Sequence, residues 1–472
     1  MVFSSSTFLL LFMPITVVVY YLVGGLITKN IKVKNLILLA ASLLFYAWGE
    51  PVYILLMLIS IVFNYVIGLD IDAAKQDDRT AEAKAKFVIA IVFNIAVLGF
   101  FKYFGFFVQN INSLFGANLR VPELALPIGI SFYTFQIMSY IIDLYRGKVD
   151  VQKKFVSFAL YISLFPQLIA GPIVKYKEIE HQLLHRRESL PKFSAGLSRF
   201  TVGLAKKLIF ANTLGAVYTQ IQTKEALSIS ALTAWIGIIC YTLQIYFDFS
   251  GYSDMAIGLG RMFGFKFNEN FNYPYIAKSI TDFWRRWHIS LSTWFRDYVY
   301  IPLGGNRRKT PRVIFNIFVV WMLTGFWHGA AWNFVMWGVY YGVLLIAEKY
   351  VFKKLIDKMP TWANHVLTLI IVMLGWVFFS APNLTEAMHY ISAMFFGGHG
   401  IADGESVYLF TSNILLILAA AFCATPIYKS VAERMPYKAV STLKIIALPM
   451  LLLLCYVLMI SETYNPFLYF RF

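Results

Sequence analysis

The chain contains 472 residues, of which 59% are hydrophobic and only 14% are charged. A soluble domain of this size could not bury so much apolar surface, and the apolar runs are too long for the strands of a membrane β-barrel. The net charge of +16 would favour a nucleic-acid partner in a soluble protein, but here the basic residues lie between apolar runs, where the positive-inside rule accounts for them. We therefore expect an all-α polytopic membrane protein without a nucleic-acid partner.

About eleven apolar segments are long enough to cross a membrane, and they recur from end to end of the chain. The first covers residues 8–27 and has no basic region before it, so we interpret it as a retained span and not as a signal peptide. Residues 124–144 form a further predicted span. The lysines and arginines between the spans predict that both termini lie outside. No soluble domain is apparent, so residues 1–472 are predicted to form a single transmembrane domain.

Residues 155–174 are apolar but have basic clusters at both ends, which a simple crossing would place on opposite sides. Pro166 and Pro172 interrupt a helix here. We expect a re-entrant element with both ends cytoplasmic, whose broken backbone is buried by protein or lines a cavity. The basic stretch that follows, 175–199, is predicted to be an interfacial helix.

Two histidines in that stretch, His181 and His185, are four residues apart, a spacing that could hold a metal ion. The sequence offers no third ligand beside them, so we interpret them as part of a solvated helix face. The three cysteines lie far apart in apolar runs and indicate neither a disulfide framework nor a metal cluster. No metal site is predicted.

The apolar run 229–247 ends in a polar motif that includes Gln244, Asp248 and Asp254. Two carboxylates in so apolar a setting need partners. They could form a catalytic pair, but structural hydrogen bonding is the favoured interpretation.

The segment 265–312 is rich in both aromatic and basic residues. If its centre is one helix, four residues share a face of that helix, namely Trp284, His288, Leu291 and Phe295. Asp282 can pair with Arg286 four residues later. An interfacial helix with an aromatic belt would explain most of the arginines, but it explains His288 and Asn306 poorly.

A histidine inside an apolar run, His328, lies beside Trp327 and among small residues. An ionisable side chain at membrane depth is costly, and it is a functional candidate for that reason. Gly325 and Gly329 would let another backbone or a slim substrate approach closely. The alternative is a packing histidine that hydrogen-bonds a neighbouring helix. This run and the next, 331–347, are predicted to form a tight hairpin.

Taken together and in order, four blocks of the sequence resemble the membrane-bound O-acyltransferase (MBOAT) family: 165–172, 248–254, 282–307 and 325–329. Each block alone is a weak signal, but the ordered set is specific and covers nearly the whole chain. The resemblance implies a fold of transmembrane helices, with re-entrant and interfacial helices, around a tunnel. Within the family the chain looks most like the integral-membrane subunit of bacterial alginate O-acetylation. The branch that D-alanylates teichoic acids shares one block but is usually shorter, and it remains an alternative.

By position, the resemblance implies that His328 is the catalytic histidine and that His288 is a second histidine at the cytoplasmic side of the tunnel. The candidates for substrate or tunnel contacts are Trp327, Trp284, Trp294, Asn306, Asp297 and Gln244. The candidates for binding donor phosphates are the basic residues Arg285, Arg286, Arg307 and Arg308.

The resemblance also implies the surroundings of the reaction. We expect no bound cofactor, a cytoplasmic donor such as acetyl-CoA or an acyl carrier protein, and a location in the bacterial inner (plasma) membrane. The acceptor would be an exported polysaccharide, reached through a periplasmic or extracellular transferase-type partner, because the chain carries no such domain.

The chemistry needs a base, because a hydroxyl does not ionise at neutral pH, whereas a neutral imidazole can take its proton during attack. No G-x-S-x-G motif offers a protein nucleophile, so we expect direct or relayed attack with His328 as the base. Two other functions stay open. In a transporter or flippase, His328 would line a permeation path. In a scaffold for a polysaccharide-modifying enzyme, both histidines would be structural.

Overall fold

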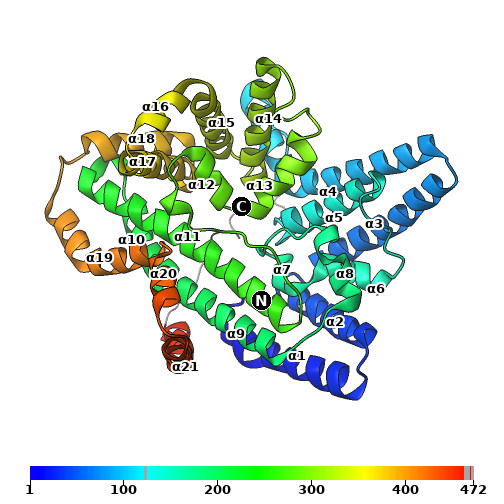
Figure 1. The fold of residues 1–472 in the computed structure, drawn as a ribbon. Helices are drawn as coiled ribbons and strands as arrows, with labels where there is room; N and C mark the ends of the chain where they lie inside the picture. The colour runs from blue at the N-terminus through cyan, green and yellow to red at the C-terminus, as the bar shows by residue number, and fades with distance from the viewer. Residues whose placement is uncertain (122–124, 462–467, 469–472) are drawn as a thin grey trace. The chain divides into compact units, whose positions relative to one another are not determined.

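The structure, a computed structural model, describes residues 1–121, 125–461 and 468. This part of the chain folds into α-helices joined by short π-helical and 3-10 segments, and it contains no strand (Figure 1). Eleven helices among the described residues are long and apolar enough to cross a membrane. The all-α, multi-pass prediction is thereby confirmed.

Contacts divide the chain into two compact units. The first contains residues 1–200 and 253–268, and the second contains residues 201–252 and 269–472. The helices α9 and α11 contribute residues to both units. That residues 1–472 form one functional domain stays a prediction.

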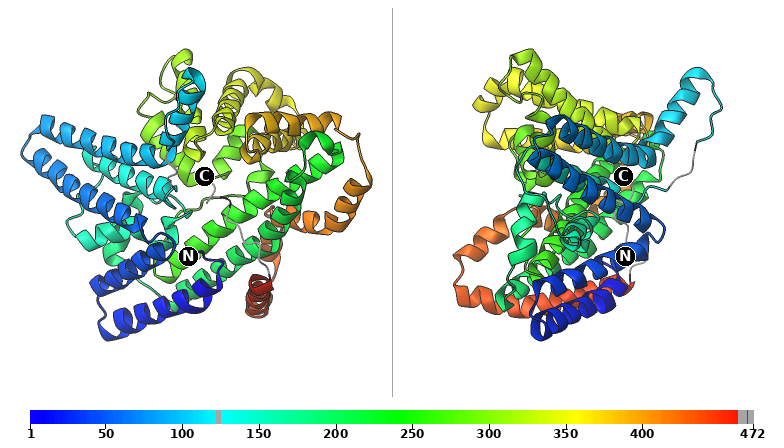
Figure 2. Two further views of the ribbon diagram at one scale, coloured as in Figure 1. Left: turned by 180° about the vertical axis from the view of Figure 1, so that it is seen from behind. Right: turned by 90° about the vertical axis from the view of Figure 1, so that its right-hand side faces the viewer.

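The first unit is built from helices in the N-terminal part of the chain. Its elements are η1 (Phe8–Phe12), α1 (Met13–Val19), η2 (Tyr20–Ile27), α2 (Ile31–Gly49), α3 (Tyr53–Gln76), α4 (Thr80–Phe115), α5 (Ile130–Tyr145), α6 (Phe155–Ser163), α7 (Phe165–Leu168), α8 (Tyr176–His185) and the start of α9 (Leu190–Ala205). Helices α3 and α4 lie side by side, and α4 also packs on α5 (Figure 2).

The predicted span over 124–144 corresponds to α5, and its predicted first residue lies outside the described residues. Helix α5 has 16 residues, fewer than the about 20 that a crossing normally needs. Its residues 130–144 are all buried. Helix α5 is therefore a core element of the first unit and is not one of the eleven long apolar helices.

The interrupted segment 155–174 is broken, as predicted. Helix α6 ends at Ser163, and α7 is a four-residue turn that contains Pro166. Residues 157–174 are all buried, and the freed backbone groups find partners. The Phe165 amide donates to Ser42 Oγ (3.1 Å), and Gln167 Nε2 donates to the Tyr161 carbonyl (2.6 Å). Protein burial thus makes the irregular backbone tolerable, and that both ends are cytoplasmic stays a prediction.

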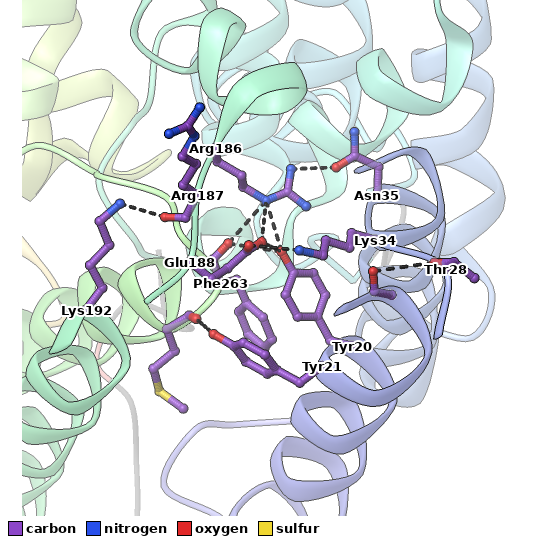
Figure 3. A network of polar contacts seen from close by, with 12 residues as sticks. Tyr20, Tyr21, Thr28, Lys34, Asn35, Arg186, Arg187, Glu188, Lys192 and Phe263 are labelled. Atoms are coloured by element: carbon purple, nitrogen blue, oxygen red, sulfur yellow. Dashed lines mark hydrogen bonds and ion pairs between the residues drawn. The ribbon is translucent and has the colours of Figure 1, made fainter. Parts of the chain in front are cut away.

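The prediction of one interfacial helix over 175–199 is wrong. Two helices occupy it, α8 and α9, and the second runs on without interruption to Gln222. The residues between them are fixed by a buried polar network (Figure 3). Arg186 Nη1 donates to Asn35 Oδ1 (2.6 Å), and its Nε donates to the Phe263 carbonyl (3.2 Å).

Glu188 completes that network, because it pairs with Lys34 Nζ (2.8 Å) and accepts a hydrogen bond from the Tyr20 hydroxyl. Burial alone would raise the pKa of Glu188, but the hydrogen bonds from Lys34 and Tyr20 outweigh it and hold the pKa below its ordinary value. The charged groups of this turn, Arg186 and Glu188, are held by partners on η2 and α2 and by the Phe263 carbonyl.

The second unit holds the aromatic and basic blocks. Its elements are η3 (Lys206–Ala211), α10 (Asn212–Gln222), η4 (Ala226–Ser228), most of α11 (Ala231–Met262), η5 (Pro274–Ile276), α12 (Ile280–Arg286), α13 (Ile289–Phe295), η6 (Arg296–Tyr300), α14 (Thr310–His328), α15 (Trp332–Ala347), η7 (Glu348–Phe352), α16 (Lys353–Lys358), α17 (Thr361–Ser380), α18 (Leu384–Phe396), α19 (Gly404–Cys423), α20 (Ile427–Arg434) and α21 (Tyr437–Ser461). The predicted hairpin is α14 and α15, which pack on each other, and α17 packs on α15.

Candidate active site

The α14–α15 hairpin positions His328. Helix α14 ends at His328, and the extended residue Gly329 begins the link to α15. The two helices approach backbone to backbone at Gly325 and Gly338, where a Cβ atom at Gly338 would lie 2.5 Å from the Trp321 carbonyl oxygen. Small residues permit this contact, and the close packing fixes the end of α14.

The His328 ring is enclosed by aromatic side chains, and the residue is only 4% exposed. Its ring centroid lies 5.0 Å from those of Trp327 and Trp337, and 5.1 Å from that of Phe379 on α17. Edge-to-face contacts of this kind hold a ring in one orientation. The imidazole is therefore shielded from bulk water.

His288 lies at a break between two helices, so the single helix considered in the sequence analysis does not form. Helix α12 ends at Arg286, α13 begins at Ile289, and His288 has a left-handed backbone (φ 44°, ψ 54°). Asn270 causes the turn, because its carbonyl accepts from the Ile289 amide (2.9 Å) and its side-chain Oδ1 accepts from the Ser290 amide (3.2 Å).

The His288 ring is almost fully buried, at 1% exposure. It packs edge-on against Phe249 (4.7 Å between centroids) and lies 6.0 Å from Trp327. Burial lowers the pKa of His288 to about 3, so the imidazole is neutral at neutral pH. Because Trp327 also contacts His328, one indole connects the two histidines.

A cavity of about 730 Å³ opens beside His288, toward the C-terminal end of α15. Among the predicted site residues, its lining contains Trp284, Arg285, His288 and Asn306. Leu291 and Phe295 line it as well, so the four residues expected on one helix face do meet, although a turn and not a helix brings them together. We call this space the first cavity.

The first cavity has cationic residues that the sequence analysis did not select, namely Arg296, Lys349 and Lys353. Lys349 Nζ donates to Asn306 Oδ1 (2.6 Å), which also accepts from the Tyr300 hydroxyl (2.6 Å). The sequence signal for Lys349 and Lys353 was their position directly after a predicted span, which did not indicate a cavity. Their approach to Arg285 depends on the packing of α15 near α12.

The other predicted residues lie outside the lining of the first cavity. Arg286 pairs with Asp282 (2.8 Å), as its spacing predicted. Asp297 pairs with Arg296 (2.9 Å), and Trp294 is buried against Tyr298. The remaining arginines, Arg307 and Arg308, are exposed just before α14.

A second cavity, of about 660 Å³, lies at the N-terminal end of α15. Its lining includes Gln244, Ala331, Asn333 and Phe379. His328 lines neither cavity. However, Thr324, one turn before it on α14, lines the first cavity, and its ring neighbour Phe379 lines the second. His328 thus lies between residues that border the two spaces.

The polar residues outside these cavities have local partners. Asp248 pairs with Lys207 (2.7 Å), and both side chains are at most 3% exposed. In the first unit, Asp254 pairs with Arg199 (2.8 Å), and the rings of His181 and His185 stack 4.7 Å apart. Each carboxylate therefore has the cationic partner that an apolar setting requires. Within the described part of the chain, no group of three or more His, Cys, Asp or Glu residues could hold a metal ion.

Comparison with known proteins identifies the family of the chain. The family model for the membrane-bound O-acyltransferases matches residues 149–388, which contain both histidines. A "Probable alginate O-acetylase AlgI" of Pseudomonas aeruginosa is 45% identical over 399 residues, covering 84% of this chain and 75% of the relative. The protein of the same description from Pseudomonas putida is 40% identical over the full length of both chains.

A third relative is the peptidoglycan O-acetyltransferase of Helicobacter pylori, which is 35% identical over 91% of this chain and 87% of its own length. These similarities extend over most of the chain, on both sides of the hairpin that carries His328. The chain belongs to the membrane-bound O-acyltransferase family and is a multi-pass membrane O-acyltransferase.

Proposed function

We propose that the chain moves an acetyl group from a cytoplasmic thioester donor across the bacterial inner membrane, for O-acetylation of an exported, alginate-like polysaccharide. His328 is the base. The observation that carries the proposal is the location of His328 between two cavities at opposite ends of α15, one of them lined with cations. An acyl carrier between two compartments needs such a two-sided approach to one reactive group.

The reaction is an acyl transfer from sulfur to oxygen. The acceptor hydroxyl attacks the thioester carbonyl, its proton passes to the His328 imidazole, the C–O bond forms, and the C–S bond breaks. The thiolate that leaves takes the proton back from the imidazolium, which restores the neutral base. The shielded, aromatic surroundings of His328 exclude the water that would otherwise hydrolyse the thioester.

The donor is bound in the first cavity. Acetyl-CoA carries phosphates, and Arg285, Arg296, Lys349 and Lys353 supply positive charge around this space. The acyl arm then extends past His288 and Trp284 toward Thr324. Positive charge at this end of the hairpin also agrees with a cytoplasmic location. An acyl carrier protein would present the same thioester on a similar arm.

The acceptor approaches through the second cavity. Gln244, Asn333 and Ser380 provide polar groups there, as a hydroxyl-bearing molecule requires. The names of two relatives refer to the O-acetylation of alginate and of peptidoglycan. We propose that a periplasmic or extracellular transferase-type partner receives the acetyl group and passes it to the polysaccharide. Phe379 separates His328 from this space and must rotate to admit the acceptor.

The experiment is label transfer in membranes that contain the complete acetylation complex. With [¹⁴C]acetyl-CoA supplied on the cytoplasmic side, His328→Gln should lower labelling of added alginate by about 10²- to 10⁴-fold, the usual contribution of a general base. His181→Gln replaces an exposed histidine on α8, which lines neither cavity, and serves as the matched control.

Unchanged labelling with His328→Gln would refute the catalytic role and favour a scaffold. Solute flux without consumption of acetyl-CoA would favour a transporter. Label in peptidoglycan instead of alginate would correct the acceptor, and transfer of D-alanine from a carrier protein would correct the acyl group.

A further inference from the structure

Asn270 and His288 are held together in the second unit by an arrangement that fixes the orientation of both side chains. Asn270 is fully buried. Its Oδ1 lies 3.2 Å from the Ser290 backbone nitrogen, 2.9 Å from Ser290 Oγ and 3.2 Å from His288 Nδ1. A backbone N–H can only donate, so the Asn270 atom that faces this group of contacts must be the carbonyl oxygen.

The amide orientation then determines the state of the His288 ring. Because the atom opposite Nδ1 is an acceptor, Nδ1 must carry the hydrogen; two facing lone pairs would repel each other. A neutral imidazole has only one N–H, so Nε2 is the acceptor of the ring. Burial lowers the pKa of His288 to about 3, which keeps the ring neutral across the physiological range.

We propose that Asn270 is a positioning residue that locks His288 in the Nδ1–H tautomer, so that His288 offers its substrate a hydrogen-bond acceptor and not a donor. His288 lines the first cavity, and an acceptor there binds a donor group of the thioester's arm. A pantetheine-type arm offers amide N–H groups of the kind required. His288 in this state cannot donate to the oxyanion that forms on the thioester carbonyl, so this stabilisation must come from another group.

The left-handed backbone of His288 is held by the same hydrogen bonds of Asn270. A non-glycine residue adopts this conformation only when its surroundings enforce it. Here the carbonyl and the side chain of Asn270 hold the next two residues, Ile289 and Ser290. The identity of the arm rests on the proposed function, whereas the tautomer rests on the hydrogen bonds of Asn270 and on the burial of the His288 ring.

The test combines a tautomer measurement with an activity measurement on the full chain. In ¹⁵N-histidine-labelled protein, the resonances of His288 are identified by their loss in His288→Gln. The wild type should show a protonated Nδ1 and an unprotonated Nε2. Ser290→Ala removes one hydrogen bond to Asn270 but leaves the contact with His288, so the tautomer should be unchanged.

Two substitutions of Asn270 perturb the tautomer in different ways. Asn270→Leu removes the acceptor, so the Nε2–H form should appear. Acetyl transfer from acetyl-CoA should fall about 10- to 100-fold, less than the roughly 10²- to 10⁴-fold that loss of a general base costs. Asn270→Asp keeps an acceptor but adds a negative charge, which favours the imidazolium. Its activity should be low at acidic pH and recover as the pH rises and His288 loses its proton.

The activities of Asn270→Asp and the wild type can be compared across pH because the rings packed on His288, those of Phe249 and Trp327, carry no charge. The charged groups in the same cavity are common to the variant and the wild type: Arg285, Arg296, Glu348, Lys349, Lys353 and Asp357. A protonated Nε2 in the wild type would overturn the proposal, as would wild-type tautomer and rate in Asn270→Leu. If the chain proves inactive toward acetyl-CoA, the proposed donor fails, but the tautomer measurement still decides the role of Asn270.

Discussion

A single methyl group added at Gly338 tests whether the close α14–α15 contact is what positions His328. In Gly338→Ala the new Cβ would lie 2.5 Å from the Trp321 carbonyl oxygen, about 0.9 Å short of the 3.4 Å at which ordinary van der Waals contact begins. The neighbouring atoms of Gly325, at 3.2 and 3.3 Å, are also backbone and cannot rotate away. Helix α15 must therefore shift from α14 by nearly 1 Å.

That shift has two expected consequences of different size. Overpacking of this kind costs about 1–3 kcal/mol of stability, partly offset by the roughly 1 kcal/mol that alanine gains over glycine in a helix. A displacement near 1 Å at a reacting group can cost about 10²-fold in rate. Trp337, the residue before Gly338, contacts His328 directly. We therefore expect a modest loss of Tm but a loss in kcat of about 100-fold.

The assay is acetyl transfer from [¹⁴C]acetyl-CoA, with Tm measured on the same preparations. Gly99→Ala is the matched control, because it places the same methyl group in a membrane-length helix where no atom lies within 4 Å. It should gain helix propensity and keep wild-type kcat. Wild-type kcat in Gly338→Ala would refute the reasoning, because it would mean that the hairpin spacing does not control His328.

Three further predictions concern the cavities and the first unit. Arg285→Glu should raise the KM for acetyl-CoA about tenfold, as expected for a lost charge-assisted hydrogen bond. Arg307→Glu changes a residue outside the lining of the first cavity and should alter this KM less than about twofold. Equal effects of the two substitutions would contradict a donor site at the first cavity. Phe379→Ala should increase hydrolysis of acetyl-CoA without an acceptor, because this ring separates His328 from the second cavity, and an unchanged hydrolysis rate would exclude it as a barrier. The pKa of Glu188 is held below its ordinary value by Lys34 and Tyr20 despite burial. The pairing of Glu188 therefore stabilises the fold above the ordinary carboxyl range, and this stability is lost as the pH falls through the depressed pKa. Glu188→Gln should lower Tm at neutral pH and weaken the dependence of Tm on acidic pH, and a Tm curve parallel to that of the wild type would be evidence against the network.

The features that could be predicted from the sequence are those that depend on short stretches of chain. Apolar length and composition predicted the membrane helices, because a crossing helix needs only its own residues to be apolar. Pro166 predicted the break after α6 for an equally local reason. The pair of Asp282 and Arg286 followed from helical spacing, and His328 was distinguished as an ionisable residue in an apolar run.

Only the tertiary structure decided how distant segments meet. Asn270 precedes His288 by 18 residues, and its hydrogen bonds hold a turn where local spacing would have allowed one continuous helix. The network around Arg186 likewise separates α8 from α9 through partners on η2 and α2 that no local pattern reveals. Arg285 and Lys349 both line the first cavity and Arg286 does not, although the sequence alone had made Arg285 and Arg286 equal candidates for binding donor phosphates. The physical reason is that hydropathy and helix propensity are properties of one segment, while a cavity and its charges are properties of the contacts between segments.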